Sequence, residues 1–209
     1  MEIEWHTSFD KSLLLNKQLI SSKNGFIAFQ NKLNSASIEM LQLKRMAESN
    51  HQICLMFCVD IRNHLWQQIN KSSTLEICFY FPLTREKYIL KGTMDKVSPQ
   101  TFSPILKDVW QKELTQEDRN EFTKEAPGLQ KQTMPEDFQS QDISQVSQNF
   151  GILLLQPIKV DRTLIKMPQV IADSRNPKFE SEFRPYQKDK RYIYELGQEG
   201  KWKITEVNP

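Results

Sequence analysis

The chain has 209 residues, a length that suits one domain with a sizeable core. Its formal net charge is +2, and the charges are mixed along the chain, which excludes the basic stripe of a nucleic-acid-binding protein. No run approaches the ~18 apolar residues of a membrane helix, and the N-terminal segment lacks the features of a signal peptide. The chain has three cysteines, an odd number. Together with the charge and the absence of these segments, this number predicts a cytoplasmic protein with reduced thiols and no nucleic-acid or membrane partner.

The first third of the chain predicts a helix followed by strands. Apolar residues at Phe9 and Leu13–Leu15 give the segment 8–20 the face of an amphipathic helix, with Thr7 or Ser8 as its cap. Runs of apolar and β-branched residues then predict strands, and the spacing of the next apolar residues predicts a short helix. The strands cover residues 26–29, 38–43 and 52–60, and the helix covers residues 62–70.

The stretch EICFYFPLTREKYILKG, residues 76–92, predicts a β-hairpin with a charged corner. Its first strand, Ile77–Phe81, is apolar on both faces. A hairpin that only has to reverse the chain favours Asn-Gly or Asp-Gly, whereas this corner holds Pro, Thr, Arg, Glu and Lys. The charge of the corner either belongs to the surface or faces a ligand.

The second half of the chain predicts helices, a polar loop and further strands. A helical insert at about 103–125 carries its apolar residues on one side, and a Gln- and Ser-rich stretch at about 129–148 predicts a flexible loop. The remaining predicted strands cover residues 149–165, 191–196 and 201–209. This order predicts a single domain, residues 1–209, built as a small antiparallel barrel with helices at its rim.

The histidines and cysteines give no catalytic or metal-binding pattern. No His pairs with another His, a Cys or a carboxylate at a ligand spacing, so no metal is expected. Cys54 and Cys58 lie four residues apart in an apolar strand and are interpreted as core residues. The sequence has no Gly-x-Ser-x-Gly elbow and no Walker or Rossmann loop, so it gives no support for hydrolase chemistry.

Two places combine residue types that can hold a cofactor. Asp60, Arg62, Asn63 and His64 follow a buried strand where a helix begins, and helix starts favour phosphate groups. The alternative is an ordinary helix cap by Asp60 or Asn63, with Arg62 in solvent. Trp202, in the last predicted strand, is either a stacking platform for a ring or a packing residue.

Three groups of residues between residue 60 and the end of the chain match one protein family. The hairpin corner carries the signature Tyr-Phe-Pro-x-Thr-Arg-Glu, the helical insert matches at its apolar positions, and the chain ends in Glu-Val-Asn-Pro. The matching residues are Tyr80–Pro82, Thr84–Glu86, Trp110, Leu114, Arg119, Phe122, Pro127, Gly128, Asn149, Phe150, Leu153–Leu155, Pro157, Asp161, Trp202 and Glu206–Pro209. With these residues the chain resembles the pyridoxamine 5′-phosphate oxidase-related FMN-binding split-barrel family, in its branch without an assigned substrate.

The resemblance implies a fold, a cofactor and an assembly. The implied fold class is mainly β with helices (α+β), a six-stranded antiparallel split β-barrel. The implied assembly is a homodimer that holds FMN in clefts at the subunit interface, and the implied function is that of an FMN-binding oxidoreductase-like protein. The implied cofactor-binding residues are Lys44, Arg62, Asn63, His64, Thr84, Arg85, Lys87 and Trp202.

The phosphate arm departs from the pattern of this branch. The branch reads Thr-Asp-Ser-Arg-Ser-x-Lys, whereas this chain keeps the Arg as Arg62 and has Leu65 in place of the Lys. On the preceding strand, a gapless placement puts Leu41 where the branch has an Arg. Lys44 or Arg45 can replace that cation in space, and the alternation of the strand decides which one.

The loss of two cations beside a phosphate dianion leaves two alternatives open. Each charge-assisted contact contributes roughly 1.5–3 kcal/mol, so FMN binding depends on whether nearby basic residues compensate. The alternative is a degenerate split-barrel homologue without flavin that acts as a ligand-binding or structural module. Vitamin B6 oxidase activity is not expected, because the Arg-x-His signature of that enzyme is missing and no His follows His64.

Overall fold

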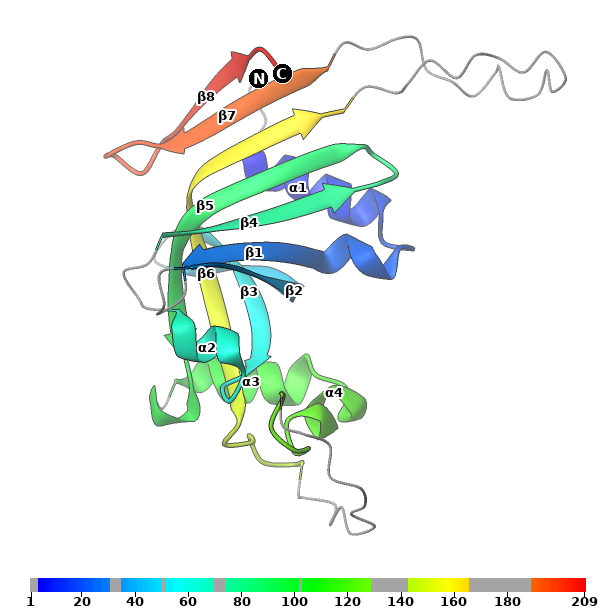
Figure 1. Ribbon diagram of the computed structural model, residues 1–209, viewed down its shortest axis with the longest axis vertical. Coiled ribbons are helices and arrows are strands. Elements are labelled where there is room, and N and C mark those ends of the chain that lie inside the picture. The colour runs from blue at the N-terminus through cyan, green and yellow to red at the C-terminus, as the bar shows by residue number, and fades with distance from the viewer. Residues whose placement is uncertain are drawn as a thin grey trace, which may run out of the picture. The chain divides into compact units, whose positions relative to one another are not determined.

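The computed structural model describes residues 4–30, 35–49, 52–69, 74–101, 103–128, 143–165 and 189–209 (Figure 1). Its helices are α1 (Trp5–Leu15), α2 (His64–Gln68), α3 (Pro104–Lys112) and α4 (Gln116–Glu121), with 3-10 helices η1 (Ile20–Lys23) and η2 (Pro99–Thr101). Its strands are β1 (Asn24–Gln30), β2 (Ala36–Ser49), β3 (Gln52–Asp60), β4 (Thr74–Phe81), β5 (Glu86–Val97), β6 (Phe150–Leu164), β7 (Lys190–Leu196) and β8 (Trp202–Val207). Among these residues, no helix is long and apolar enough to cross a membrane.

The strands form one sheet in the order β3-β2-β1-β4-β5-β6-β7-β8, and β3 pairs a second time, with β6. Antiparallel ladders join β3 to β2 and β6, and β7 to β6 and β8. The second pairing of β3 closes a ring of six strands, β1 to β6, as the split-barrel prediction requires. The predicted fold class is confirmed, and β7 and β8 extend the described sheet to eight strands.

The described chain separates into two compact units, each assembled from segments that are far apart in the sequence. Unit 1 comprises Met1–Phe26, Glu76–Lys91 and Ile158–Pro209. Unit 2 comprises Ile27–Leu75 and Gly92–Pro157. The single domain over residues 1–209 stays a prediction.

In unit 1, the first turns of α1 pack against the β4–β5 hairpin. The buried face of α1 has the i, i+3, i+4, i+7 spacing of one helix side and consists of Trp5, Ser8, Phe9 and Ser12. The ring of Phe9 lies edge-on, with centroid distances of 5.1, 5.3 and 5.1 Å, to the rings of Phe79, Phe81 and Tyr88. One face of the apolar strand β4 is therefore covered by a helix of the same unit.

The apolar face predicted for this helix is wrong at its C-terminal end. Leu14 and Leu15 are 61% and 53% exposed. The helix begins at Trp5, earlier than the predicted Ser8, and its N-cap residue is Glu4. Because the buried side is centred on Trp5 and Phe9, the helical rotation turns Leu14 and Leu15 away from it.

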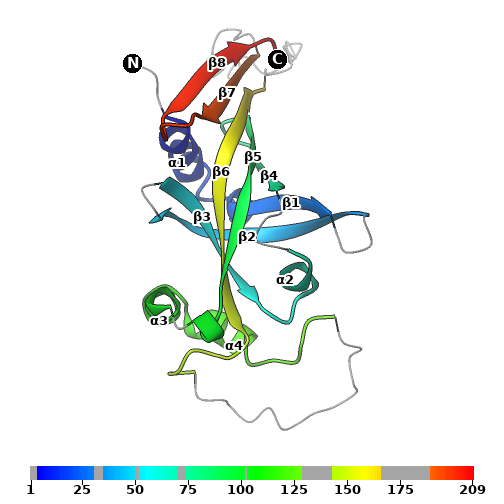
Figure 2. The ribbon, with the colours of Figure 1, turned by 90° about the vertical axis from the view of Figure 1, so that its left-hand side faces the viewer.

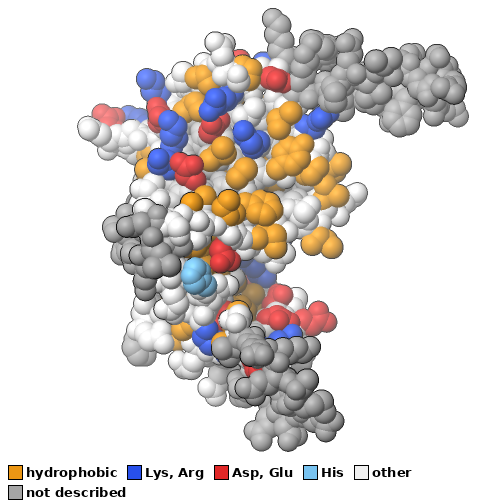
Figure 3. Space-filling view, in the orientation of Figure 1, with side chains coloured by type: hydrophobic (Ala, Val, Ile, Leu, Met, Phe, Trp, Pro, Cys, Tyr) orange, Lys and Arg blue, Asp and Glu red, His pale blue; other side chains and the backbone are white. Residues whose placement is uncertain are grey.

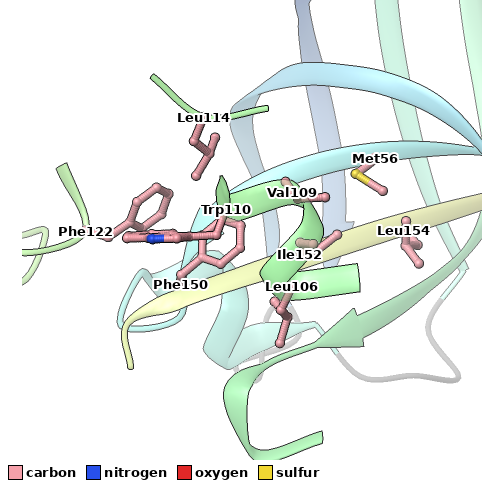
Figure 4. Packing of buried hydrophobic residues seen from close by; sticks show 9 residues of the cluster. All are labelled: Met56, Leu106, Val109, Trp110, Leu114, Phe122, Phe150, Ile152 and Leu154. Carbon is pink, nitrogen blue, oxygen red and sulfur yellow. The ribbon is translucent and has the colours of Figure 1, made fainter. Parts of the chain in front are cut away.

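In unit 2, the helical insert packs against β3 and β6 (Figure 2). Figure 4 shows the contact, in which the rings of Trp110 of α3, Phe122 and Phe150 pack against one another. The Trp110 ring centroid is 5.8 Å from that of Phe122 and 5.2 Å from that of Phe150. Its Nε1 donates to the Ile143 carbonyl oxygen at 3.0 Å. The insert predicted at about 103–125 thus contains α3 and α4, whereas most of the loop predicted at 129–148 lies outside the described residues.

Candidate functional site

At the end of β3, Arg62 is bound by the carboxylate of Asp60. Its backbone N–H and its Nε donate to Oδ1 at 2.8 and 3.0 Å, and its Nη2 donates to Oδ2 at 2.6 Å. The same Nη2 donates to the carbonyl oxygen of Lys124 at 3.0 Å. The hydrogen bonds that its side chain donates to the Asp60 carboxylate raise the pKa of Arg62 above its ordinary value. Arg62 is therefore a paired cation and not a solvated one.

The next two residues start α2. Asn63 is the N-cap, and its Oδ1 accepts a hydrogen bond from the Leu65 backbone N–H at 2.9 Å. His64 is the first residue of the helix; its side chain is 59% exposed, and its Nδ1 lies 3.9 Å from Glu39 Oε1. The capping alternative that the sequence left open accounts for Asn63.

A β-bulge decides how Lys44 and Arg45 are directed. Leu43 pairs with Phe57 and Arg45 pairs with Met56, so Lys44 is the extra residue of β2. Lys44 Nζ lies 3.7 Å from Asp118 Oδ2, and Arg45 Nε lies 2.9 Å from Glu113 Oε1. Both carboxylates belong to the helical insert. Simple alternation would have sent the two side chains to opposite faces.

The thiol of Cys58 lies among these charges. Burial raises the pKa of Cys58 to about 12, and Lys44, Glu113, Asp118 and Arg45 are the charged groups that act on it. The thiol therefore stays protonated at neutral pH and is a poor nucleophile. All three cysteines are free, and within the described ranges no group of His, Cys, Asp and Glu could hold a metal ion.

Unit 2 has basic residues of the kind that bind a phosphate group, but these residues are already paired with other groups. Lys44, Arg45 and Arg62 are the cations that phosphate recognition needs. Each of them already binds an acceptor of its own unit. Leu41 and Leu65, which stand where the resemblance expects basic residues, are buried at 7% and 2% exposure. A phosphate can therefore use these cations only by displacing their present partners.

In unit 1, the hairpin corner is held by Asn16, the C-cap residue of α1. Asn16 Nδ2 donates to Thr84 Oγ1 at 3.2 Å, and Asn16 Oδ1 accepts from the Leu83 backbone N–H at 2.8 Å. Arg85 has a positive φ of 55°, uncommon for a residue other than glycine. Its carbonyl oxygen accepts from the backbone N–H of Ile165 at 2.8 Å. The backbone of the corner is thus fixed from two sides.

Glu86, the acidic residue of the signature, points inward and binds Arg162 of β6. Arg162 Nη2 donates to Glu86 Oε1 at 2.6 Å, and its Nη1 donates to Ser8 Oγ at 3.1 Å. Glu86 Oε2 accepts from Ser12 Oγ and, at 3.2 Å, from the Tyr88 hydroxyl. Burial raises the pKa of Tyr88, so the hydroxyl stays protonated and donates. The charge of Glu86 thus belongs to a buried network.

Sequence reasoning missed the partners of Glu86. Arg162 lies in a strand that reads as apolar at its start, and no motif marks it. The available signal was the pair Ser8 and Ser12, which are four residues apart on the same helix side as Trp5 and Phe9. Small polar residues on a buried helix face indicate a polar partner on the element that the helix covers.

Lys87 and Trp202 complete the predicted set. Lys87 is half-buried on β5 and forms no ion pair with the described residues. The Trp202 ring packs edge-on against Trp5 of α1, with centroids 5.8 Å apart and planes at 65°. The packing alternative accounts for this side of Trp202. Of the eight predicted residues, unit 2 holds Lys44, Arg62, Asn63 and His64, and unit 1 holds Thr84, Arg85, Lys87 and Trp202. Their assembly into one site stays a prediction.

Comparison with known proteins supports the fold. No protein-family model and no curated protein matches the chain. A pyridoxamine 5′-phosphate oxidase-related, FMN binding protein from Nostoc punctiforme is 23% identical, with all of both chains covered and a TM-score of 0.76. PhzG from Burkholderia lata, solved with tetrahydrophenazine-1-carboxylic acid, is 12% identical, with 99% of this chain and 93% of that chain covered and a TM-score of 0.63. The predicted resemblance is confirmed at the level of the fold.

Proposed function

We propose that this chain binds FMN and acts as an oxidoreductase-like protein related to pyridoxamine 5′-phosphate oxidase. The proposal rests on the full-length similarity of its fold to an FMN-binding protein, at a TM-score of 0.76. Bound FMN would supply a ring that accepts and returns hydride, while the protein would bind and orient it. Arg62 and Lys44 are proposed for the phosphate, and Arg85 and Lys87 are proposed as further cationic contacts.

We also propose that the chain forms a homodimer. The Ile77–Phe81 part of β4 is apolar on both faces, a pattern of strands that are covered on both sides. In unit 1, α1 covers one face, while Tyr80 and the neighbouring-strand residue Phe26 are 45% and 55% exposed. Hydrophobic side chains gather over the β4–β5 hairpin (Figure 3). A second copy of the chain would cover them.

We further propose a cytoplasmic location for the protein. The proposal is supported by the cysteines, all three of which are free.

An absorbance spectrum of the purified protein tests the cofactor. Bands near 375 and 450 nm that persist through desalting, about where flavins absorb, would support FMN binding. Excess FMN should also raise the melting temperature, because a ligand that binds only the folded state stabilises it. A colourless protein whose melting temperature does not respond to FMN would overturn the proposal.

The pairing of the basic residues in unit 2 favours a second function. Lys44, Arg45 and Arg62 are paired inside unit 2, and Leu41 and Leu65 are buried. These features suit a split-barrel homologue that has no flavin and acts as a ligand-binding or structural module. The same spectrum and thermal titration separate this function from the first one.

A further inference from the structure

The helical insert supplies an acceptor to each of the three cations that are candidates for a phosphate in unit 2. Glu113 Oε1 lies 2.9 Å from Arg45 Nε, and Asp118 Oδ2 lies 3.7 Å from Lys44 Nζ. The carbonyl oxygen of Lys124 accepts from Arg62 at 3.0 Å. These acceptors come from one continuous stretch of chain, which approaches cations at two separate places, on β2 and after β3.

The acceptors are held in place by the core. Leu114 follows Glu113 directly and is 6% exposed, and Phe122, close to Lys124, is 8% exposed. Both belong to the cluster around Trp110 (Figure 4). A side chain anchored in a close-packed core fixes the backbone beside it, so its neighbours do not need to be ordered when they bind a cation.

Hydrogen bonds inside the insert fix the turn that carries the two carboxylates. Arg119 Nη2 donates to the carbonyl oxygens of Gln111 and Leu114 at 3.2 and 3.0 Å, which ties α4 to the end of α3. Thr115 and Asp118 form a capping box, in which Asp118 Oδ2 accepts from the Thr115 backbone N–H at 3.1 Å. The Asp118 carboxylate therefore faces Lys44 from a defined position.

We infer that the helical insert is a built-in competitor for the anion-binding cations of this chain: Glu113 and Asp118 hold Lys44 and Arg45 and thereby weaken the binding of a phosphate group. This rests on the proposed function, since the anion in question is the phosphate of FMN. A phosphate must release the cations from the two carboxylates and also tolerate their negative charge nearby. Removing the carboxylates should therefore tighten binding.

The test is a titration of the full chain with FMN, followed by fluorescence quenching of the flavin. The Glu113→Gln/Asp118→Asn variant should bind about tenfold more tightly than the wild type, a factor that corresponds to roughly 1.4 kcal/mol. Asn at 118 keeps an acceptor for the capping box, and circular dichroism checks that the helices remain. Glu117→Gln removes one negative charge, half of what the double variant removes, from an exposed position of α4 and should change the affinity by less than about twofold.

A cation variant and a second probe complete the test. Lys44→Met in the double-variant background should cancel most of the gain, because the gain depends on a released cation. Equal affinities for wild type, double variant and Glu117→Gln would overturn the inference. If no variant binds FMN, the proposed function fails, and inorganic phosphate in a thermal-shift titration decides the inference. A larger shift in the double variant supports the competition, and equal shifts overturn it.

Discussion

At the scale of single residues, Glu86 has a different environment from the one its sequence position suggests. It lies in a charged hairpin corner, yet it is 7% exposed and binds Arg162, Ser12 and Tyr88. Its neighbours Thr84 and Arg85 are partly exposed, and Thr84 is bound by Asn16. The signature residues therefore do not share one role, because strand alternation sends Glu86 to the face that α1 covers.

The ion pair of Glu86 and Arg162 gives a prediction at this scale. The Arg162→Met variant should lose about 3 kcal/mol in the free energy of unfolding, because it leaves a buried carboxylate without its cation. Urea denaturation measures the loss. Lys159→Met removes an exposed pair with Glu195 at 2.8 Å and should cost far less, because both side chains are solvated. Similar losses in both variants would contradict the prediction, because the pair of Glu86 and Arg162 would then contribute no more to stability than an exposed ion pair.

At the scale of elements, local patterns gave the strands and tertiary contacts corrected the helix. The predicted strand over 52–60 coincides with β3, because a mostly apolar run of 9 residues is shorter than most helices and therefore favours a strand. In α1 the apolar residues form two groups, and the sequence could not say which group is buried. The aromatic face of β4 and β5 selects Trp5 and Phe9. The bulge at Lys44 was equally hidden, because it depends on the register with β3.

Gly92 in β5 gives a prediction for an element. A Cβ atom at this position would lie 2.0 Å from the carbonyl oxygen of Gln156, on the neighbouring strand β6. Gly92→Ala should therefore force the two backbones apart and cost more than about 4 kcal/mol, measured by urea denaturation or as lost yield of folded protein. The adjacent exposed change Lys91→Ala should stay within about 1 kcal/mol. A Gly92→Ala variant of normal stability would contradict this close approach.

At the scale of the whole molecule, the β4 strand links the sequence to the proposed assembly. Helix α1 covers one face of this strand, whereas Tyr80 on its other face is 45% exposed. Among the described residues of unit 1, Tyr80 and Phe26 are exposed, and a second chain that lies against them would explain these apolar side chains.

The oligomeric state tests this proposal. The wild-type chain should sediment as a dimer at micromolar concentration, and the Phe26→Asp/Tyr80→Asp variant should sediment as a monomer, because two charges would have to be desolvated in the interface. Leu14→Asp is the matched control, since Leu14 is 61% exposed but lies on α1, so this variant should remain dimeric. A wild-type monomer, or a dimer that survives the double change, would contradict the proposed interface.

The sequence by itself determined the strands, the position of the helical insert and, through the hairpin signature, the split-barrel fold. These features follow from local periodicity and from a motif read in order along the chain. Only the tertiary structure decided which charged side chains are paired with one another. Arg45 and Glu113, or Glu86 and Arg162, meet because the fold brings distant segments together. Whether a charged side chain is available to bind a ligand depends on the charges that lie near it in space. The order of residues along the chain does not show these neighbours.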